Sequence, residues 1–339
     1  MPPRRIELVR VAGTHREVGF QIGAATAEVV RRHAAAMDAG RLAQAAAYRD
    51  VTAAELPWLV EELDGVAAGA GADPLAVFAA SIEEIAVEEP APASRCSDLV
   101  AGPPATPDGH VWAAHNNDLG PESEDELIAL EWRVPGDPVS FTIGIGPWIS
   151  VGFNSAGLAL TGNELSPNDD RVGIPRLLLV RDILRRRTLD EAIEAALHPR
   201  RASSYNNLLS HRDGGVVSVE GSATDAELLR PDEDGTLAHT NHYTSARMAA
   251  YERDPGDIEG SCARQRTARS WLGRGPATPE LLRAALSDHE GAPDSLCRHV
   301  EHGAQSKTVF WCLADVTEGT VRYGRGNPCD SQEQRYAFN

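Results

Sequence analysis

The first 95 residues carry apolar side chains mostly at the spacing of amphipathic helices. Thr52-Ala-Ala-Glu55 matches a capping box, in which the hydroxyl and the carboxylate bind the first free amides of a helix. We expect the helix that begins there to bury Trp58, Leu63 and Val66 against the rest of the chain. The elements predicted for this part are a strand at 6–12 and three helices. The first begins near Thr14 and runs through residues 24–37, the second runs from Thr52 through residue 66, and the third covers 74–87.

Residues 88–95 contain Pro90 and Pro92 and predict an exposed, extended connector. Beyond Cys96 short strand-like segments dominate, with helices grouped between them. The predicted strands are 110–115, 127–134, 140–145, 149–153, 158–161, 205–210, 216–220, 237–242, 308–313 and 320–323, and the predicted helices are 175–186, 189–197, 263–272 and 279–288. This grouping favours stacked sheets covered by helices over alternating βαβ units.

Composition narrows the function mainly by exclusion. The chain has 339 residues, with 32 basic against 50 acidic side chains and a net charge of −18. Nucleic acid and an anionic membrane surface are therefore not expected as partners, because phosphate binding needs clustered cations. An apolar content of 42% excludes wholesale disorder, and no run of about 18 apolar residues predicts a membrane span.

Cysteine and histidine spacing indicates neither a disulfide framework nor a metal site. The five cysteines are widely spaced without a CxxC pair, and the N-terminus lacks the apolar segment of a signal peptide. His239 and His242 would point to opposite faces of a strand, and His299 and His302 suit a helix face without an HExxH motif. We therefore expect a reduced, cytoplasmic protein with no metal and no cofactor. Phosphate loops and a GxSxG elbow are absent from the sequence.

Cys96 is the strongest candidate for chemistry. It directly follows the connector, where helix-rich sequence gives way to strand-rich sequence. A thiol at such a junction is placed to attack the carbonyl that precedes it. The alternative is that Cys96 is a small, partly buried hydrophobic side chain.

Several short segments, in one order along the chain, carry a resemblance to a known family. They are Gly13-Thr-His-Arg-Glu-Val-Gly19-Phe-Gln-Ile-Gly23, Arg95-Cys96-Ser97, His115-Asn-Asn-Asp118, Val151-Gly-Phe-Asn-Ser-Ala-Gly157 and His239-Thr-Asn-His242. In these segments the chain resembles the acyl-coenzyme A:6-aminopenicillanic acid acyltransferase family of N-terminal-nucleophile (Ntn) hydrolases.

The resemblance implies an α+β fold, a four-layer αββα sandwich of the Ntn hydrolase type. It also implies self-cleavage between Arg95 and Cys96. The products would be an N-terminal helical segment, 1–95, that stays bound, and a catalytic part, 96–339, which together form one αββα unit. Cys96 would be the nucleophile, with its own freed α-amine as the base. Asn241 would donate to the oxyanion, and Asp118 would orient the new ammonium.

The chain departs from the family pattern at several positions. Arg95 stands where the family has glycine, and Asp98 stands where it has threonine. The family's arginine before the last core strand has no clear counterpart, and Gln305 or Lys307 would take its place. The residues expected to bind substrate or position the leaving segment are Ser97, Asp98, Asn154, Asn163, His239 and Gln305.

The leading hypothesis is a self-processing cysteine amidohydrolase that cleaves or transfers the acyl group of a small N-acyl amide. Its expected partners are that small molecule, the cleaved N-terminal segment and a second copy in a homo-oligomer. A coenzyme-A-dependent N-acyltransferase stays open, with Arg185-Arg-Arg187 and Arg200-Arg201 as candidates to bind its phosphates. A chain that never cleaves and only binds a ligand also stays open, because Arg95 replaces the family glycine.

Overall fold

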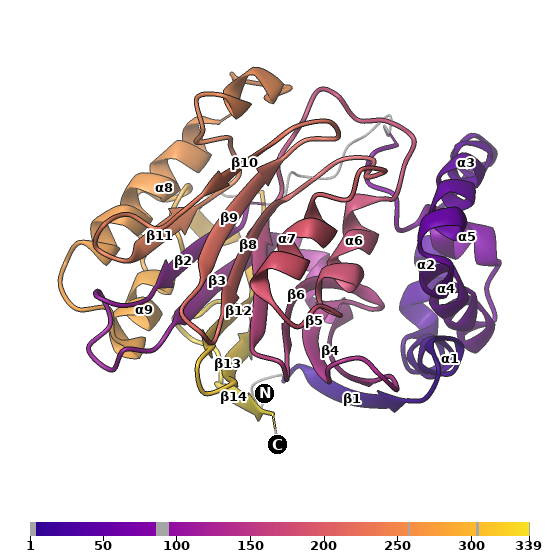
Figure 1. The fold of residues 1–339 in the computed structure, drawn as a ribbon, viewed down its shortest axis with the longest axis horizontal. Coiled ribbons are helices and arrows are strands. Elements are labelled where there is room, and N and C mark those ends of the chain that lie inside the picture. Colours follow the sequence, from indigo (N-terminus) through magenta and orange to yellow (C-terminus); the bar gives the residue numbers. More distant parts are fainter. Residues whose placement is uncertain (1–4, 86–94, 257, 303–304, 339) are drawn as a thin grey trace.

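Two β-sheets stack face to face, with helices on both outer sides (Figure 1). The computed structural model describes residues 5–85, 95–256, 258–302 and 305–338. Most of the predicted connector, residues 88–94, therefore lies outside the described residues. The expected α+β fold with four αββα layers is confirmed, because separate apolar clusters lie between the two sheets and between each sheet and its helices.

The first sheet has eight strands, all antiparallel to their neighbours except β1, which is parallel to β4. Their order is β1 (Glu7–Ala12), β4 (Leu127–Arg133), β5 (Ser140–Ile145), β6 (Trp148–Asn154), β7 (Leu158–Asn163), β8 (Asn206–His211), β9 (Val216–Gly221) and β10 (Ala226–Leu229). The predicted strands of this sheet are present with small shifts in their ends, and β10 was not predicted.

The second sheet has six antiparallel strands. Their order is β11 (Thr236–His239), β2 (Ser97–Ala101), β3 (Trp112–Leu119), β12 (Lys307–Asp315), β13 (Thr320–Arg325) and β14 (Gln334–Ala337). The strand β2 follows Cys96 directly and pairs with both β11 and β3. This interior position holds Cys96 at the end of a well-anchored strand.

Of the α-helices in the described residues, seven lie on the side of the eight-stranded sheet and two cover the six-stranded sheet (Figure 1). The first group is α1 (His15–Ala25), α2 (Ala27–Ala35), α3 (Ala39–Glu55), α4 (Pro57–Ala70), α5 (Pro74–Ala79), α6 (Arg176–Ile183) and α7 (Leu189–Ala196). The second group is α8 (Glu259–Leu272) and α9 (Pro279–Leu286), and the 3₁₀ turns are η1 (Pro121–Glu126), η2 (Met248–Tyr251) and η3 (Val300–His302). Among the described helices, none combines the length and the apolar character that crossing a membrane requires.

The capping box predicted at Thr52 is wrong. Thr52 lies inside α3, fully buried, and its hydroxyl donates to the carbonyl of Tyr48 at 2.9 Å. Asp38 caps this helix instead, by accepting from the amide of Arg41 at 2.8 Å. The alanine-rich sequence before Thr52 has high helix propensity and carries the helix through the apparent start signal. The next helix begins at Pro57, a favourable first position for proline.

Glycines allow α1 and α4 to cross with their backbones in contact. A Cβ atom on Gly19 would lie 1.9 Å from the carbonyl oxygen of Glu62, and one on Gly23 would lie 2.0 Å from that of Val66. From the other side, a Cβ on Gly65 would lie 2.3 Å from the carbonyl oxygen of Arg16. Such separations leave no room for a side chain, so this crossing depends on glycine.

Gly23→Ala should therefore destabilise the protein, although alanine is the better helix former. Overpacking of this kind costs about 1–3 kcal/mol, and the obstructing atom is backbone that cannot turn away. Gly40→Ala is the matched control, because Gly40 begins an exposed part of α3 and a Cβ there meets only the side chain of Asp38. Urea unfolding should show a lower midpoint for Gly23→Ala, and an unchanged or higher midpoint for Gly40→Ala. Equal midpoints for the two variants would contradict the close crossing.

Candidate active site

Cys96 lies at a cavity of about 100 Å³ between the ends of several strands and α6. One part of the lining is aliphatic and consists of Leu119, Ile149, Leu160, Leu177 and Val180. The polar lining residues are Glu83, Asn117, Ser150, Thr161, Glu164, Tyr205 and Asn207. Among the described cysteines, Cys96 alone lines this cavity.

A buried arginine holds the backbone of Cys96. Arg264 on α8 donates to the carbonyl oxygen of Cys96 at 3.0 Å and approaches the Ser97 hydroxyl at 3.3 Å. Its other terminal nitrogen donates to the Asn241 side-chain oxygen at 3.1 Å. Burial lowers the pKa of Arg264 to about 10, which leaves the guanidinium charged at neutral pH. Arg264 therefore connects two of the residues predicted from the sequence, Cys96 and Asn241.

Asn241 follows β11 and has its amide partly engaged. Its Nδ2 donates to the carbonyl oxygen of Glu164, one of the cavity-lining residues, at 3.1 Å. Its backbone amide donates to the Ser261 hydroxyl at 2.8 Å. An asparagine amide has two N–H donors, so this contact leaves a second donor for a ligand beside Glu164.

Asp118 lies fully buried near the end of β3, close to the chain that enters Cys96. Its backbone carbonyl accepts from the amide of Arg95 at 3.2 Å, and its Oδ1 accepts from the Thr308 hydroxyl at 2.7 Å. Arg298 Nε lies 3.9 Å from the other carboxylate oxygen. Burial raises the pKa of Asp118 to about 6, against the lowering effect of Arg264 and Arg298.

A buried histidine–aspartate pair lies beside the thiol. His115 Nδ1 is 2.8 Å from Asp98 Oδ1, and both side chains are fully buried. Asn117 Nδ2 lies 3.5 Å from Cys96 Sγ and 3.3 Å from His115 Nε2. Burial disfavours the charged imidazole, but Asp98 and the neighbouring Cys96 outweigh it and raise the pKa of His115 to about 10. Asp98 therefore pairs with His115, a role that differs from the expected positioning of substrate or leaving segment.

This pair predicts a loss of stability at alkaline pH. A raised folded-state pKa contributes stability that is fully present below the ordinary histidine value near 6.5 and is lost as pH rises through about 10. Urea unfolding of the wild type should therefore give a smaller free energy of unfolding at pH 9.5 than at pH 6.5.

The matched control for this prediction is the double variant Asp98→Asn/His115→Gln. It keeps two neutral polar side chains and avoids leaving one charge buried alone. Its free energy of unfolding should fall much less between the same two pH values. An equal fall in both proteins would assign the pH dependence to other groups.

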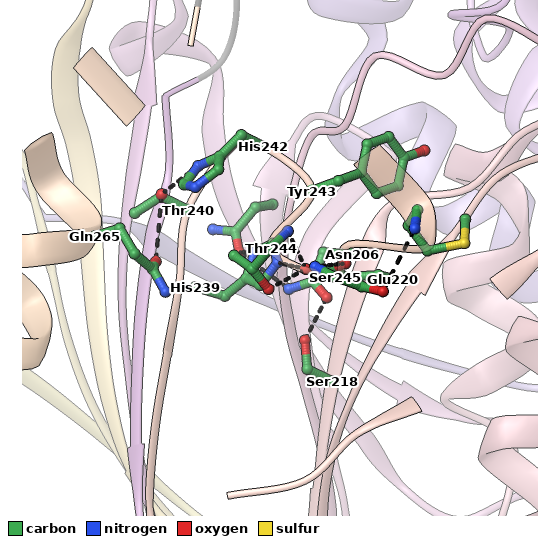
Figure 2. Close-up of polar contacts among 12 residues, drawn as sticks. Asn206, Ser218, Glu220, His239, Thr240, His242, Tyr243, Thr244, Ser245 and Gln265 are labelled. Carbon is green, nitrogen blue, oxygen red and sulfur yellow. Dashed lines mark hydrogen bonds and ion pairs between the residues drawn. The ribbon is translucent and has the colours of Figure 1, made fainter. Parts of the chain in front are cut away.

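Two expected substrate-binding residues, Asn163 and His239, belong to a buried polar network instead. His239 Nε2 lies 2.7 Å from Glu220 Oε1, and its Nδ1 lies 3.0 Å from Asn163 Oδ1. The same glutamate oxygen accepts from the backbone amide of Thr244 at 2.7 Å. Figure 2 shows His239, Glu220 and Thr244 of this network. Neither Asn163 nor His239 lines the cavity, and the network ties the end of β11 at His239 to Thr244 through Glu220.

The other expected substrate-binding residues lie in different places. Ser97 is buried on β2 against Arg264. Asn154 binds the turn that follows β6, because its Oδ1 accepts from the amides of Ala156 and Leu158, and it lies outside the cavity that Cys96 lines. Gln305 is exposed in a separate hollow that also contains Arg95.

Neither Gln305 nor Lys307, the residues expected in place of the family arginine, lines the cavity of Cys96, and the arginine beside the Asp118 carboxylate is Arg298. Lys307 instead pairs with Glu124 at 2.6 Å. Arg298 lies in the loop before β12 and had no sequence signal, because that loop has no periodic pattern. Arg264 did have a sequence signal, because it stands four residues before Ala268 and eight before Leu272, on one face of the predicted helix. The structure buries all three residues of this face.

Comparisons with known proteins agree with the family resemblance. The family model described as acyl-coenzyme A:6-aminopenicillanic acid acyl-transferase matches residues 105–330. No curated protein sequence matches the chain.

Solved structures give likenesses at low identity. An N-acylethanolamine-hydrolysing acid amidase orthologue from Caenorhabditis elegans has 14% identity and a TM-score of 0.44, covering 66% of this chain and 93% of its own. A variant of the conjugated bile acid hydrolase from Clostridium perfringens has 14% identity and a TM-score of 0.47, covering 72% and 97%. Penicillin V acylase from Agrobacterium tumefaciens has 13% identity and a TM-score of 0.41, covering 68% and 83%.

Proposed function

Because this chain belongs to the acyl-coenzyme A:6-aminopenicillanic acid acyl-transferase family, we propose that it is a self-processing cysteine Ntn amidohydrolase. It would cleave, or transfer, the acyl group of a small N-acyl amide through a thioester on Cys96. The observation that carries this proposal is the position of Cys96. It lies immediately before the interior strand β2, at the cavity, with its carbonyl held by Arg264.

Processing begins with attack of the Cys96 sulfur on the Arg95 carbonyl carbon. The C–N bond between the two residues breaks, a thioester forms, and the α-nitrogen of Cys96 becomes a free amine. Water then hydrolyses the thioester, which leaves a carboxylate on Arg95 and restores the thiol. In the cleaved enzyme the α-amine accepts the thiol proton in each turnover, because its ordinary pKa near 8 suits a base.

Before cleavage that amine does not exist, so another group must accept the thiol proton. His115 is not that group, because Asp98 orients its ring and its pKa is raised to about 10 against burial, so it already carries a proton at neutral pH. The thiol proton would pass to water, and the imidazolium beside the sulfur would stabilise the thiolate. Asn117, whose amide lies 3.5 Å from the sulfur, donates to the thiolate that results.

The cavity favours substrates with an apolar acyl group. Its aliphatic residues offer a surface for hydrocarbon, and burial of each CH₂ contributes about 0.8 kcal/mol. Glu83 and Glu164 share the single guanidinium of Arg176, at 2.8 Å and 2.9 Å. This polar side therefore carries net negative charge and disfavours anionic substrates.

The coenzyme-A alternative has less support from the geometry. Arg185 donates two hydrogen bonds to the Asp137 carboxylate, from Nε at 2.7 Å and from Nη2 at 3.0 Å. Arg186 donates to Asp182 at 2.6 Å. Arg201 donates to backbone carbonyls, including that of Ser222 at 2.6 Å. None of these arginines is among the described residues that line the cavity. A donor that carries phosphates would need cations that are not already paired.

The test combines processing with trapping. Purified full-length protein should separate into two fragments on a denaturing gel, and sequencing of the larger one should begin at Cys96. The enzyme is then mixed with N-acyl amides whose amine part is neutral, cationic or anionic, and quenched in acid. Intact-mass spectrometry should show the acyl group added to the 96–339 fragment, least with the anionic amides.

A chain that stays whole and takes up no acyl group from the series would support the ligand-binding alternative. Acyl transfer that depends on an added thioester donor would support the coenzyme-A alternative. Either result would overturn the proposed amidohydrolase.

A further inference from the structure

Two histidines and two cysteines from separate segments converge on one point. His289, Cys297 and His299 lie in the loop after α9, and Cys329 lies in the turn after β13. Their imidazole nitrogens and sulfurs all lie within 4.8 Å of one another. This cluster is separate from the cavity that Cys96 lines. Thiolates and imidazoles are the ligands that zinc binds in structural sites.

Four of the six separations within the cluster match those of a tetrahedral metal site. Sγ of Cys297 lies 3.7 Å from Sγ of Cys329, and Nε2 of His289 lies 3.1 Å from Nε2 of His299. Nε2 of His299 lies 3.4 Å from each sulfur. With Zn–S near 2.3 Å and Zn–N near 2.0 Å, a tetrahedral site has sulfurs about 3.8 Å apart, nitrogens about 3.3 Å and mixed pairs about 3.5 Å apart. The four observed separations follow this pattern.

A neighbouring side chain supports the cluster. Asn327 Nδ2 lies 3.5 Å from Cys297 Sγ and donates to the carbonyl oxygen of Arg298 at 2.6 Å. Hydrogen bonds to a ligating sulfur are typical of the shell that orients metal ligands. Asn327 and Cys329 belong to the same turn. The contacts of Asn327 with Cys297 and Arg298 therefore hold this turn against the loop that carries the other ligands.

A disulfide explains the cluster less well. A disulfide brings its sulfurs to about 2.05 Å, whereas these lie 3.7 Å apart. It would also involve only Cys297 and Cys329. It gives no reason for His289 and His299 to direct nitrogens toward the same point.

We propose that His289, Cys297, His299 and Cys329 form a structural Zn²⁺ site with four protein ligands. Binding transfers the two thiol protons to solvent and forms two Zn–S and two Zn–N bonds. The site leaves no open position for a substrate, so its role is structural. The sequence expectation of no metal rested on local spacing, and this site joins ligands that the fold, not the spacing, brings together.

The position of the site gives it a consequence for the buried carboxylate. Arg298 lies between the ligands Cys297 and His299, and its amide donates to the Thr308 hydroxyl at 3.0 Å. Thr308 donates to Asp118 at 2.7 Å, and Arg298 Nε approaches the same carboxylate at 3.9 Å. Zinc would therefore fix the loop that places Arg298 beside Asp118.

The test uses the full-length protein under reducing conditions, stripped with a chelator and then titrated with Zn²⁺ or Co²⁺. We expect one zinc ion per chain by elemental analysis and a higher melting temperature with zinc. Cobalt should give the strong visible bands of a tetrahedral ion and the near-ultraviolet bands of thiolate ligation. These readouts do not depend on any activity at Cys96.

Variants identify the ligands. Cys329→Ser and His289→Ala should lose stoichiometric zinc and the tetrahedral cobalt spectrum. Asn327→Ala should bind zinc about 10–100-fold more weakly. Cys262→Ser is the matched control, because Cys262 lies on α8 outside the cluster, and it should bind zinc normally.

Two outcomes would overturn the proposal. One is a stripped, reduced wild type that takes up no zinc. The other is zinc binding that Cys329→Ser and His289→Ala leave unchanged.

Discussion

Cys96→Ala is expected to remain a single full-length chain and to form no acyl-enzyme. The sulfur is the atom that attacks the Arg95 carbonyl in processing and the substrate carbonyl in turnover, so both reactions require it. Removing a catalytic nucleophile lowers turnover by roughly 10⁶-fold in a well-studied serine protease. A loss of that size places the variant at background. Cys96→Ser should cleave slowly, because an alcohol at neutral pH is a poorer nucleophile than a thiolate.

Cys262→Ala is the control for thiol loss, because Cys262 is a half-buried free cysteine that does not line the cavity. It should cleave and turn over like the wild type. Denaturing gels over a time course and intact mass follow all three variants. Fragments that end at Arg95 in Cys96→Ala would show that Cys96 does not perform the cleavage.

Asn241→Ala is expected to lower kcat by roughly 10²–10³-fold with little change in KM, the usual cost of losing one oxyanion donor. A tetrahedral oxyanion forms both when the thioester is made and when it is broken, so both steps are affected. The structure adds a complication, because Asn241 also accepts a hydrogen bond from Arg264. Loss of activity in the alanine variant alone would not separate the two roles.

Asn241→Asp separates these two roles. The aspartate keeps an oxygen for Arg264, at a site where the asparagine oxygen now accepts at 3.1 Å, but it has no N–H to donate. We expect it to be less active than Asn241→Ala, because it sets a carboxylate near the oxyanion. Recovery of turnover in Asn241→Asp would instead mean that Asn241 acts by positioning Arg264. Thermal melting of both variants checks that each is folded.

Periodicity predicted most of the elements but not all of their boundaries. The segment 140–145 was found as a strand because its apolar residues alternate with small or polar ones, although both of its faces are buried in the stacked sheets. The start signal at Thr52 failed because it falls inside an alanine-rich helix, where helix propensity is stronger than a local capping motif. Edge strands β10 and β14 are only four residues long and leave little pattern to detect.

The candidate site was predicted where a residue lies next to a distinctive motif, and missed where the fold alone supplies it. Cys96, Asp118 and Asn241 came from short segments that resemble the family, and their roles stay predictions. His115 was inside one of those segments, but its pairing with Asp98 depends on the register between β2 and β3, which places the two opposite each other. Arg298 and the cluster around Cys297 come from an irregular loop, whose contacts no spacing rule predicts.

The strand β1 gives the proposed cleavage a kinetic consequence. It is the edge strand of the eight-stranded sheet, paired in parallel with β4 over six residues. The backbone of Ile6 just before it exchanges two hydrogen bonds with Gln334, near the other end of the chain, at 2.7 Å and 2.9 Å. Once the bond at Arg95 is cut, this strand and its helices become a separate polypeptide. Refolding of the cleaved protein would then be bimolecular, so its rate should fall on dilution, whereas refolding of uncleaved Cys96→Ala should be independent of concentration.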